Sequence, residues 1–484
     1  MGVSDSMRAA ERRATERAFV HTIAGRDGAA QARFDVINPA TGLVFAQAPD
    51  ATREQLDACV AAARRAQPHW AALPLPERHA RLLRLADVLL ANREEIAALI
   101  TLEQGKPFAR AADEVTRAAT QLQRLVALEL PVQVLRDDDT LRIELHHAPL
   151  GVVGAITPWN MPLVLSVTKA VHALHTGNTV IIKPSPYTPL AVLRMGELAR
   201  EVFPPGVLNV IAGGAELGRW MTEHPGLDKI SFTGSVPTGK RVMAGAAGTL
   251  KRVTLELGGN DAAIVLDDAD PKAIAQQLFA AAFVNSGQIC MALKRLYVPE
   301  CLHDAVCDEL AQRARSARVG DGFEPGVELG PVQNLAQYRI VLELLDDARR
   351  AGGRFLAGGA ALDRPGYFIA PTVVAGLSEG ARLVDEEPFG PVLPVLAYRD
   401  VDEALQRANG TRFGLAGSVW SADVARAAAV AARLEVGTAW VNQHVGLDAH
   451  VPFGGAKESG LGCEYGSEGL KQYTRMLALH VPRR

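Results

Sequence analysis

The sequence is poor in the features that mark several common classes of protein. It has five cysteines among 484 residues, and an odd number in so long a chain argues against a disulfide framework. The net charge of −3 argues against nucleic acid or an anionic membrane as a partner, because both need a basic surface. No apolar run reaches the ~18 residues of a membrane span, and Met1–Arg17 lacks the apolar core of a secretory signal. We therefore expect a cytoplasmic protein.

The chain also lacks a complete set of metal ligands. Cys301, His303 and Cys307 are closely spaced, but no further Cys pair or His pair completes a tetrahedral site. We interpret these three residues as solvated or packed helix positions, and we expect no metal.

A phosphate-binding motif is present in incomplete form. In Phe232–Arg241 a strand, a Gly-x4-Gly-Lys spacing and a following helix fit a P-loop, but Arg241 stands where a Mg²⁺-binding hydroxyl is needed. The Gly234-Ser235 turn before the helix suits a pyrophosphate bound without metal. The usual Gly-x-Gly-x-x-Gly fingerprint of a dinucleotide site is missing as well.

What the chain has is two long regions that alternate strands and helices. Its length exceeds the size of a single core, so two or three domains are expected. The alternation predicts parallel βαβ units, with ligands bound at the turns that follow the strands. The predicted strands are Val152–Ile156, Thr179–Ile182, Val207–Ile211 and Lys229–Phe232 in the first region, and Arg295–Val298, Pro391–Val395 and Thr438–Asn442 in the second.

Other segments precede or interrupt these regions. Residues 35–49 read as short strands, and apolar residues at helical spacing predict helices over 52–111, divided at Pro74 and Pro76. Leu141–His146 alternates apolar and polar residues, which predicts a half-buried strand. A lone amphipathic strand needs a partner edge, so we interpret it as a contact with another domain or subunit.

Cys290 and Glu256 are the candidate reactive groups. Cys290 ends an apolar segment after Gly287, where a partly exposed thiol can attack a carbonyl carbon; the alternative is a small core residue. Glu256 interrupts the apolar run Val253–Leu257 before a glycine pair. A buried carboxylate there can activate water, and the alternative is an exposed residue on an edge strand.

Asn160 and Lys183 are candidates for binding, because each follows or ends a predicted strand. The side-chain amide of Asn160 can donate to a developing oxyanion together with the N–H of Cys290; the alternative is an ordinary turn residue between two prolines. Lys183 can bind ribose hydroxyls or a phosphate, and the alternative is a solvated lysine.

Taken together and in order, these residues lie in motifs that resemble those of the aldehyde dehydrogenase superfamily. The resemblance extends from Asp35 to Tyr473, nearly the whole chain, and so many ordered motifs exclude a chance match. The motifs are Pro158-Trp159-Asn160, Lys183-Pro184-Ser185, Phe232-Thr233-Gly234-Ser235, Leu255-Glu256-Leu257-Gly258-Gly259, Gly287-Gln288-Ile289-Cys290, Glu387-Pro388-Phe389-Gly390-Pro391 and Pro452-Phe453-Gly454-Gly455 with Lys457, Ser459 and Gly460.

The resemblance implies an α/β fold of two doubly wound parallel α/β domains and a small β oligomerisation arm. Because members of the family are dimers or tetramers, a homodimer or homotetramer is expected, with Leu141–His146 and Gln472–Val481 in the arm. The implied division is 1–128 and 149–257 for a dinucleotide-binding domain, 258–456 for a catalytic domain with the nucleophilic cysteine, and 129–148 and 457–484 for the arm.

The resemblance also implies a reaction, the NAD(P)-dependent oxidation of a small-molecule aldehyde to its carboxylic acid. Cys290 attacks the aldehyde, and Asn160 and the N–H of Cys290 hold the resulting thiohemiacetal. Hydride passes to the nicotinamide, and Glu256 activates the water that hydrolyses the thioester. Relatives that acylate coenzyme A tend to lack this glutamate, so Glu256 favours hydrolysis, with CoA acylation as the alternative. A non-catalytic relative would be expected to lose Cys290 or Glu256.

Several cofactor contacts are implied in the same way. Lys183 and Glu387 hold ribose hydroxyls in the family. Trp159 and Ser235 contact the phosphates, and Phe389 positions the nicotinamide ribose. The other residues expected at the NAD or NADP site are Thr157, Ser185, Pro186, Gly234 and Gly258.

Pro186 departs from the pattern of members that prefer NAD, which usually carry glutamate at this place. A glutamate there accepts a hydrogen bond from the adenosine 2′-hydroxyl and repels a 2′-phosphate. Its loss predicts that NADP is used as well as NAD, with the 2′-phosphate near Lys183 and Ser185.

The sequence departs from the family's pattern at two further places. Asn260-Asp261 follows the glycine pair, where a lysine is commoner in the first place. Cys463 replaces a frequent arginine, whereas Glu464 is retained and could serve a proton path beside Glu256.

The positions that match the family's substrate tunnel are apolar. They include no arginine for a distal carboxylate, so we expect an aliphatic or small aromatic aldehyde; the alternative is a semialdehyde dehydrogenase for acidic or hydroxylated aldehydes. His444 and His450 flank this loop and are interpreted as surface residues. The tunnel positions are Met161, Leu165, Val284, Ile289, Met291, Val445, Leu447 and Phe453.

Overall fold

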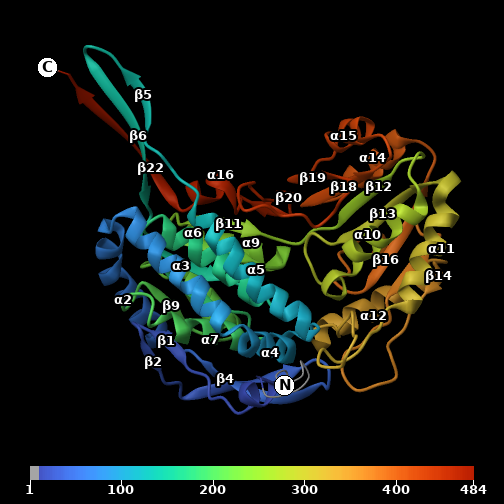
Figure 1. The fold of residues 1–484 in the computed structure, drawn as a ribbon, viewed down its shortest axis with the longest axis horizontal. Helices are drawn as coiled ribbons and strands as arrows, with labels where there is room; N and C mark the ends of the chain where they lie inside the picture. The colour runs from blue at the N-terminus through green and yellow to red at the C-terminus, as the bar shows by residue number, and fades with distance from the viewer. Residues whose placement is uncertain (1–9, 484) are drawn as a thin grey trace.

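The computed structural model describes residues 10–483 of the chain. Residues 1–9, half of the N-terminal segment considered above, lie outside this range, and residues 10–15 are helical. No helix within 10–483 is long and apolar enough to cross a membrane. The chain forms two α/β lobes, and a β arm projects from one of them (Figure 1).

The first lobe is built on an eight-stranded sheet. In sheet order its strands are β2 (Arg26–Gly28), β1 (His21–Ile23), β9 (Leu208–Val210), β8 (Thr179–Lys183), β7 (Val152–Ile156), β10 (Lys229–Thr233), β11 (Arg252–Glu256) and β21 (Gly460–Leu461). The strands from β9 to β11 are parallel, and the chain order reverses between β7 and β10. Doubly wound sheets bind ligands at such a reversal, beyond the carboxyl ends of the strands.

Helices cover both faces of this sheet, because successive strand residues point to opposite faces. Val153 and Ala155 pack against one helix layer, whereas Val152 and Ile156 pack against the other. The first layer contains α3 (Leu75–Ala91), α4 (Arg93–Gln104), α5 (Phe108–Val126), α6 (Pro162–His175) and α7 (Leu190–Ala199), and the second contains α2 (Arg53–Ala72), α8 (Ala215–Glu223) and α9 (Val236–Ala247). The helices predicted over 52–111 and the division at Pro74 are confirmed, but Pro76 lies within α3, and the breaks at Asn92 and at residues 105–107 were not predicted.

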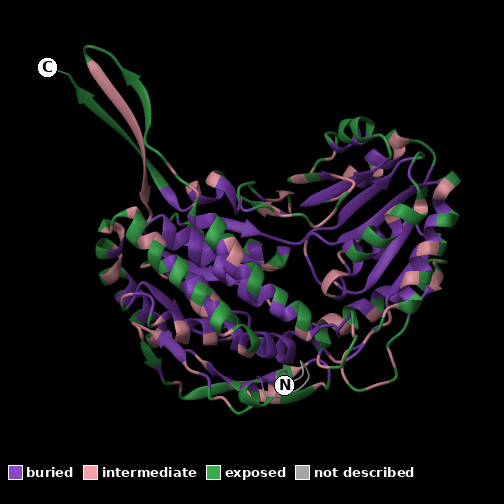
Figure 2. Ribbon diagram, in the orientation of Figure 1, coloured by how far each residue is buried: buried purple, intermediate pink, exposed green. Residues whose placement is uncertain are grey.

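The second lobe holds a seven-stranded sheet, in which only the edge strand β14 (Arg354–Ala357) is antiparallel to its neighbour. The other strands, in sheet order, are β15 (Thr372–Ala375), β16 (Val392–Tyr398), β13 (Leu293–Pro299), β12 (Asp261–Val265), β18 (Ala416–Trp420) and β19 (Thr438–Val441). One face packs on α10 (Pro271–Phe283) and α11 (Glu300–Ser316), and the other on α12 (Leu335–Arg350), α13 (Arg382–Asp385), α14 (Val401–Asn409) and α15 (Val424–Ala431). The predicted fold class is confirmed, and the strands of both sheets are mostly buried (Figure 2).

The arm is a three-stranded antiparallel sheet in the order β22-β6-β5. It contains β5 (Gln133–Asp137), β6 (Leu141–Pro149) and β22 (Thr474–Pro482), so the strand predicted at Leu141–His146 is confirmed. Apolar side chains of β22 face solvent, and Met476 is 73% exposed (Figure 2). The remaining elements are the hairpin of β3 (Ala32–Asn38) and β4 (Leu43–Asp50), the 3-10 turn η1 (Val284–Gly287), the pair of β17 (Phe413–Gly414) and β20 (Ala456–Lys457), and α16 (Gly466–Lys471).

Candidate active site

The carboxyl ends of the first sheet and the amino ends of the second meet at one junction. β11 ends at Glu256, and residues 257–260 connect it to the start of β12. Cys290 shortly precedes β13, the neighbour of β12. Asn160, just beyond β7, donates from Nδ2 to the carbonyl oxygen of Gln288 at 2.9 Å. The three residues predicted to carry the chemistry therefore lie together although they belong to different elements.

A strained turn presents Cys290 at this junction. Asn285, Ser286 and Gly287 all have left-handed backbones, with φ of 51°, 56° and 74°. A Cβ at Gly287 would collide with the carbonyl of Gly390, so the turn requires glycine there. The hydroxyl of Ser286 donates to the carbonyl of Gly330 at 2.8 Å, which holds the turn against the loop before α12.

The Cys290 thiol is free and partly exposed at the edge of the first lobe's apolar core. Burial raises its pKa to about 12, and the nearby carboxylates of Glu256, Glu387 and Asp261 add to that increase. Lys294 acts in the opposite direction. The thiol therefore needs a nearby base or cation to react at neutral pH.

Asn160 is fixed by a buried ion pair beneath it. Lys106 donates to the carbonyl oxygen of Asn160 at 3.0 Å and to Glu114 on α5 at 2.5 Å. The other oxygen of Glu114 accepts the N–H of Leu163, in the first turn of α6, at 3.0 Å. With one side-chain N–H of Asn160 bonded to Gln288, the other can face a reacting oxygen.

Glu256 is the last residue of β11 and is only 5% exposed, so the interpretation as a surface residue is wrong. Its Oε1 has no hydrogen-bond partner among residues 10–483. Burial, and then the charge of Glu464, raises its pKa well above the ordinary carboxyl value. Glu464 itself forms a buried ion pair with Lys169, which also reaches Ser231 at 3.1 Å. A buried carboxylate with a raised pKa is suited to accept a proton near neutral pH.

Lys183, the last residue of β8, is also buried, so the alternative of a solvated lysine is wrong. Its ammonium donates to the carbonyl of Pro184 at 3.3 Å, and burial lowers its pKa to about 8. Ser185 is buried beside it, and Pro186 is half-buried. An ammonium with so little compensation for its burial fits an anionic or hydroxyl-bearing ligand.

The turn after β10 has open donors for a phosphate. Ser235 is the N-cap residue of α9, but its hydroxyl bonds to Thr238 at 3.0 Å and caps no backbone N–H. The first N–H groups of α9 are therefore left for a pyrophosphate. Gly234 is half-buried on the same turn, and its N–H donates to the carbonyl of Glu256 at 3.0 Å. Thr157, at the end of β7, is tied by its own N–H to the carbonyl of Lys183 at 3.0 Å.

The second lobe supplies the facing side of this region. Glu387 accepts the N–H of Gly259 at 3.2 Å, and a Cβ at Gly258 would collide with its carboxylate. The ring of Phe389 meets that of Trp159 edge-on, with centroids 5.3 Å apart. The two lobes therefore make contact through residues that the family resemblance assigns to the cofactor, and the arrangement fits a dinucleotide.

The eight predicted tunnel residues, with Cys290, pack in or against one apolar cluster. Met161 and Val284 line a cavity of about 320 Å³ between the lobes. This cavity is also lined by Arg110, Asp113 and Arg117 of α5, which are not among the eight predicted positions. The helix α5 contributes to the cavity from more than forty residues before Met161, the first of the eight positions.

The two histidines near the tunnel differ. His450 is exposed, as expected, but the side chain of His444 is fully buried, with Nδ1 2.8 Å from the hydroxyl of Ser418. Burial lowers the pKa of His444 to about 3, so its ring is neutral. In the described part of the chain no cluster of His, Cys, Asp or Glu is placed to hold a metal.

Sequence reasoning missed the charged residues that support the site. Lys106, Glu114, Lys169 and Lys294 are all buried and hydrogen-bonded around it. Glu103 is buried as well, and its carboxylate accepts the first N–H groups of α7 at 2.6 and 2.9 Å. Glu103 and Glu114 could have been recognised in the sequence, because each is a charged residue on the apolar side of its helix.

The fold and this junction define an α/β oxidoreductase with a dinucleotide-type sheet and a second sheet that presents a thiol. A profile of the aldehyde dehydrogenase family matches residues 26–478. The chain is 38% identical over 465 residues to aldehyde dehydrogenase LUC3 of Fusarium sp, covering 96% of this chain and 98% of that one.

Solved structures agree with these relationships. The NAD⁺ complex of an aldehyde dehydrogenase from Bacillus cereus superimposes with a TM-score of 0.95 at 35% identity, covering 98% of each chain. Betaine aldehyde dehydrogenase from Staphylococcus aureus, also with NAD⁺, gives 0.95 at 32% identity, covering 99% of this chain and 98% of that one. The chain belongs to the aldehyde dehydrogenase family and is an NAD(P)-dependent aldehyde dehydrogenase.

Proposed function

We propose that the enzyme oxidises an aldehyde to a carboxylic acid through a covalent adduct on Cys290. The sulfur attacks the carbonyl carbon, while the free side-chain N–H of Asn160 and the N–H of Cys290 donate to the oxygen. When bound, the nicotinamide would accept the hydride from the former aldehyde carbon, and loss of the adduct's hydroxyl proton to solvent then leaves a thioester on Cys290. Glu256 then takes a proton from the water that attacks the thioester, and the C–S bond breaks to release the acid and the thiol.

The buried, unpaired carboxylate of Glu256 is the observation that carries this proposal. Its Oε1 lacks a hydrogen-bond partner in the described range, and its pKa is raised well above the ordinary value. A carboxylate held in this way destabilises the fold, so a role at the thiol is the reason to retain it. Hydrolysis is favoured over transfer to coenzyme A on the same ground.

We also propose that NADP is accepted as well as NAD. Lys183 and Ser185 lie beside Pro186, which replaces the glutamate that would repel a 2′-phosphate, although the carboxylate of Asp50 also acts on Lys183. Lys183 and Glu387 would hold the riboses, Ser235 and the start of α9 the phosphates, and Phe389 the nicotinamide side. The division into a dinucleotide-binding domain, a catalytic domain and an arm stays a prediction on the same basis.

For the substrate, the apolar walls around Cys290 favour an aliphatic or small aromatic aldehyde. A second candidate is an aldehyde with an apolar stem and a distal acidic group, because Arg110 and Arg117 line the cavity. Arg110 already lies 3.7 Å from Asp113, which leaves Arg117 as the better cation for such a group. Hexanal, benzaldehyde and succinate semialdehyde, each tested with wild type and Arg117→Leu, separate the two: a drop in kcat/KM confined to the semialdehyde favours the acidic substrate.

The reaction itself is tested by product analysis. We expect NAD(P)H and free carboxylic acid in equal amounts with and without coenzyme A, and none with Cys290→Ala. Acyl-CoA as the main product, or full activity of Cys290→Ala, would contradict the proposal.

The arm is proposed to join two or more copies of the chain. Its strand β22 exposes Met476, Leu477 and Leu479, and it has one unpaired edge. Size-exclusion chromatography with light scattering tests this, and a monomer at micromolar concentration would contradict it.

A further inference from the structure

Lys294 connects two parts of the candidate site that the family resemblance treats separately. Its side chain is 2% exposed, and its ammonium donates to the carbonyl oxygens of Ile289 and Cys290 at 2.7 and 2.8 Å. It also lies 3.3 Å from Oε1 of Glu387 and 5.6 Å from the centre of the Phe389 ring. Its three N–H groups therefore reach the peptide of the nucleophile on one side and the proposed ribose-binding carboxylate on the other.

We propose that Lys294 is a positioning residue that holds the Cys290 turn in place and links occupation of Glu387 to the reactivity of the Cys290 thiol. This inference rests on the proposed function, because it takes Cys290 as the nucleophile and Glu387 as a cofactor ligand. It adds a residue that lies outside every motif on which the resemblance depends.

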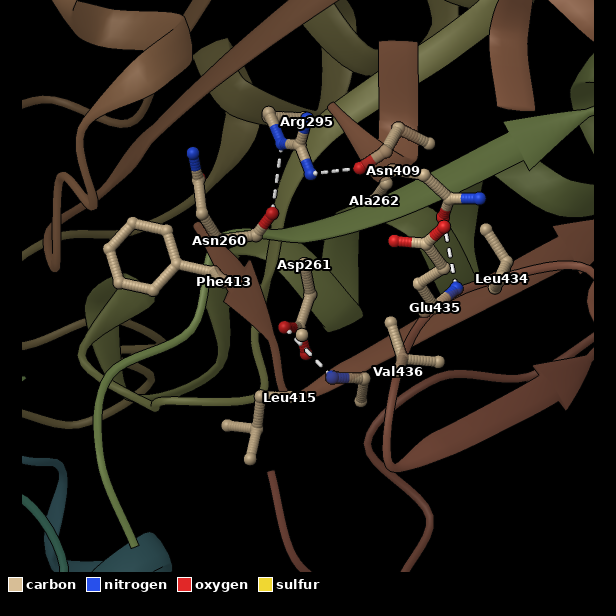
Figure 3. A pocket seen from close by; sticks show the side chains of 14 residues that line it. Asn260, Asp261, Ala262, Arg295, Asn409, Phe413, Leu415, Leu434, Glu435 and Val436 are labelled. Carbon is tan, nitrogen blue, oxygen red and sulfur yellow. Dashed lines mark hydrogen bonds between the residues drawn. The ribbon is translucent and has the colours of Figure 1, made fainter. Parts of the chain in front are cut away.

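Lys294 is the cation that favours ionisation of the Cys290 thiol. The next residue, Arg295, points to the other side of β13, where it donates to the carbonyls of Asn260 at 2.8 Å and Ala408 at 3.0 Å (Figure 3). Three carboxylates, those of Glu256, Glu387 and Asp261, disfavour ionisation of the Cys290 thiol, and Lys294 opposes them. Without this ammonium, formation of the Cys290 thiolate would be less favourable.

Asp261 is a neighbour whose charge changes around pH 8. Its Oδ1 accepts the N–H of Ala416 at 3.1 Å (Figure 3), and its Oδ2 has no partner within residues 10–483. The closest histidine nitrogen, Nε2 of His444, is 4.0 Å from that oxygen. Burial raises the pKa of Asp261 to about 8, whereas Lys294 lowers it. Asp261 is therefore mostly neutral at pH 7 and becomes an anion above pH 8.

Glu387 provides the route by which a bound cofactor would alter the reactivity of the Cys290 thiol. One of its oxygens serves both the N–H of Gly259 and the ammonium of Lys294. A ribose hydroxyl that binds Glu387 competes with Lys294 for the carboxylate, so the ammonium is freer to act on the Cys290 peptide and thiol. By linkage, modification of the thiol must in turn alter cofactor affinity.

The test measures alkylation of Cys290 by iodoacetamide, followed by peptide mass on the full-length protein. This readout needs no turnover, so it does not depend on the substrate. Wild type, Lys294→Met, Lys294→Arg and Asp261→Asn are compared from pH 6.5 to 9.5, with and without NAD, and Cys290→Ala gives the background. Circular dichroism confirms that each variant is folded.

We expect Lys294→Met to react about ten-fold more slowly at pH 8.5 and to lose the response to NAD, since the thiol pKa rises by about one unit. Lys294→Arg should recover most of the rate, because it keeps the charge. Asp261→Asn should match wild type at pH 6.5 and react faster above pH 8, as only the ionised carboxylate is removed.

Wild-type alkylation and a wild-type NAD response in Lys294→Met would overturn the proposal. An arginine variant as slow as the methionine variant would also overturn it, by showing that shape and not charge matters. If Lys294→Met does not fold, the arginine variant and the opposite effect of Asp261→Asn decide the question. Aldehyde oxidation by Cys290→Ala would instead refute the proposed function, and the alkylation result would show which of the two had failed.

Discussion

Two buried carboxylates around the candidate site, those of Glu256 and Glu464, differ in how they are held. Glu464 is buried in an ion pair with Lys169, whereas Oε1 of Glu256 is buried without a hydrogen-bond partner in the part of the chain that the structure describes. A buried charge with its partner supports the fold locally, and a buried carboxylate without one costs stability. The comparison indicates that Glu464 serves the structure around the site and that Glu256 is held ready for a proton.

Two buried lysines, one in each lobe, show the same contrast between a group with few hydrogen bonds and a group with several. On the first, Lys183 has a single 3.3 Å hydrogen bond to a carbonyl. On the second, Lys294 is bonded to two carbonyls and lies beside Glu387. We expect Lys183, whose hydrogen bonds are incomplete, to contact a ligand. We expect Lys294, whose hydrogen bonds are complete, to position the residues that react.

The largest effect is expected when the open carboxylate is removed. Glu256→Gln should lower kcat by about 10²–10⁴-fold, because it removes the base for thioester hydrolysis. The first turnover should still release NADH as a burst, since hydride transfer precedes hydrolysis. Stopped-flow absorbance measures both phases, and an unchanged steady-state rate would refute the assignment of Glu256.

Removing the charge of Glu464, which is paired with Lys169, should mainly lower the stability of the fold. Glu464→Gln leaves Lys169 buried without its anion, which we expect to lower the free energy of unfolding by about 3–5 kcal/mol. Thermal or urea denaturation measures the loss. A variant as stable as wild type would show that the pair does not support the fold, and the contrast with Glu256 would fail.

The proposed role of Lys183 in NADP binding can be tested by substituting Pro186, which lies beside it. Pro186→Glu restores a carboxylate near Lys183, and we expect kcat/KM with NADP to fall by about ten-fold relative to NAD, roughly 1.4 kcal/mol. Pro186→Gln is the uncharged control and should fall less. If wild type itself uses NADP less than about one hundredth as well as NAD, about 2.7 kcal/mol, the proposed tolerance of NADP is wrong.

The pH dependence of cofactor binding follows from the same lysine. Burial lowers the pKa of Lys183 to about 8, so its positive charge is present below that pH and lost above it. KM for NADP should therefore rise several-fold between pH 7 and 9, and more than KM for NAD, which lacks the 2′-phosphate. Lys183→Arg keeps its charge over this range and should flatten the profile.

The smallest effect is a gain in stability from Glu256→Gln. The folded-state pKa of Glu256 is raised above its unfolded value, so its contribution is favourable at low pH and is lost as the pH rises above the ordinary carboxyl range. The variant should melt about 1–3 °C above wild type at pH 8 and close to it at pH 4. A lower melting temperature at pH 8 would mean that the carboxylate is stabilised by contacts after all.

Local pattern was enough to predict the strands and several of the residues at their ends. An apolar run such as Val253–Leu257 predicts a strand, and Glu256 stands out because it breaks the run. Asn160 and Lys183 stand out in the same way, as polar residues where a predicted strand stops. The α/β class followed from the alternation of strand and helix.

Tertiary structure decided which of these residues share a site and what their charges do. Asn160 reaches the peptide of Gln288, Lys294 reaches Glu387, and Lys169 reaches Glu464 across 295 positions of sequence. The sequence pattern also does not show that His444 is buried or that Arg110 and Arg117 of α5 line the cavity, because both depend on how distant elements pack. Periodicity fixes which way a side chain points from its own element, but pKa and partner depend on what another element places against it.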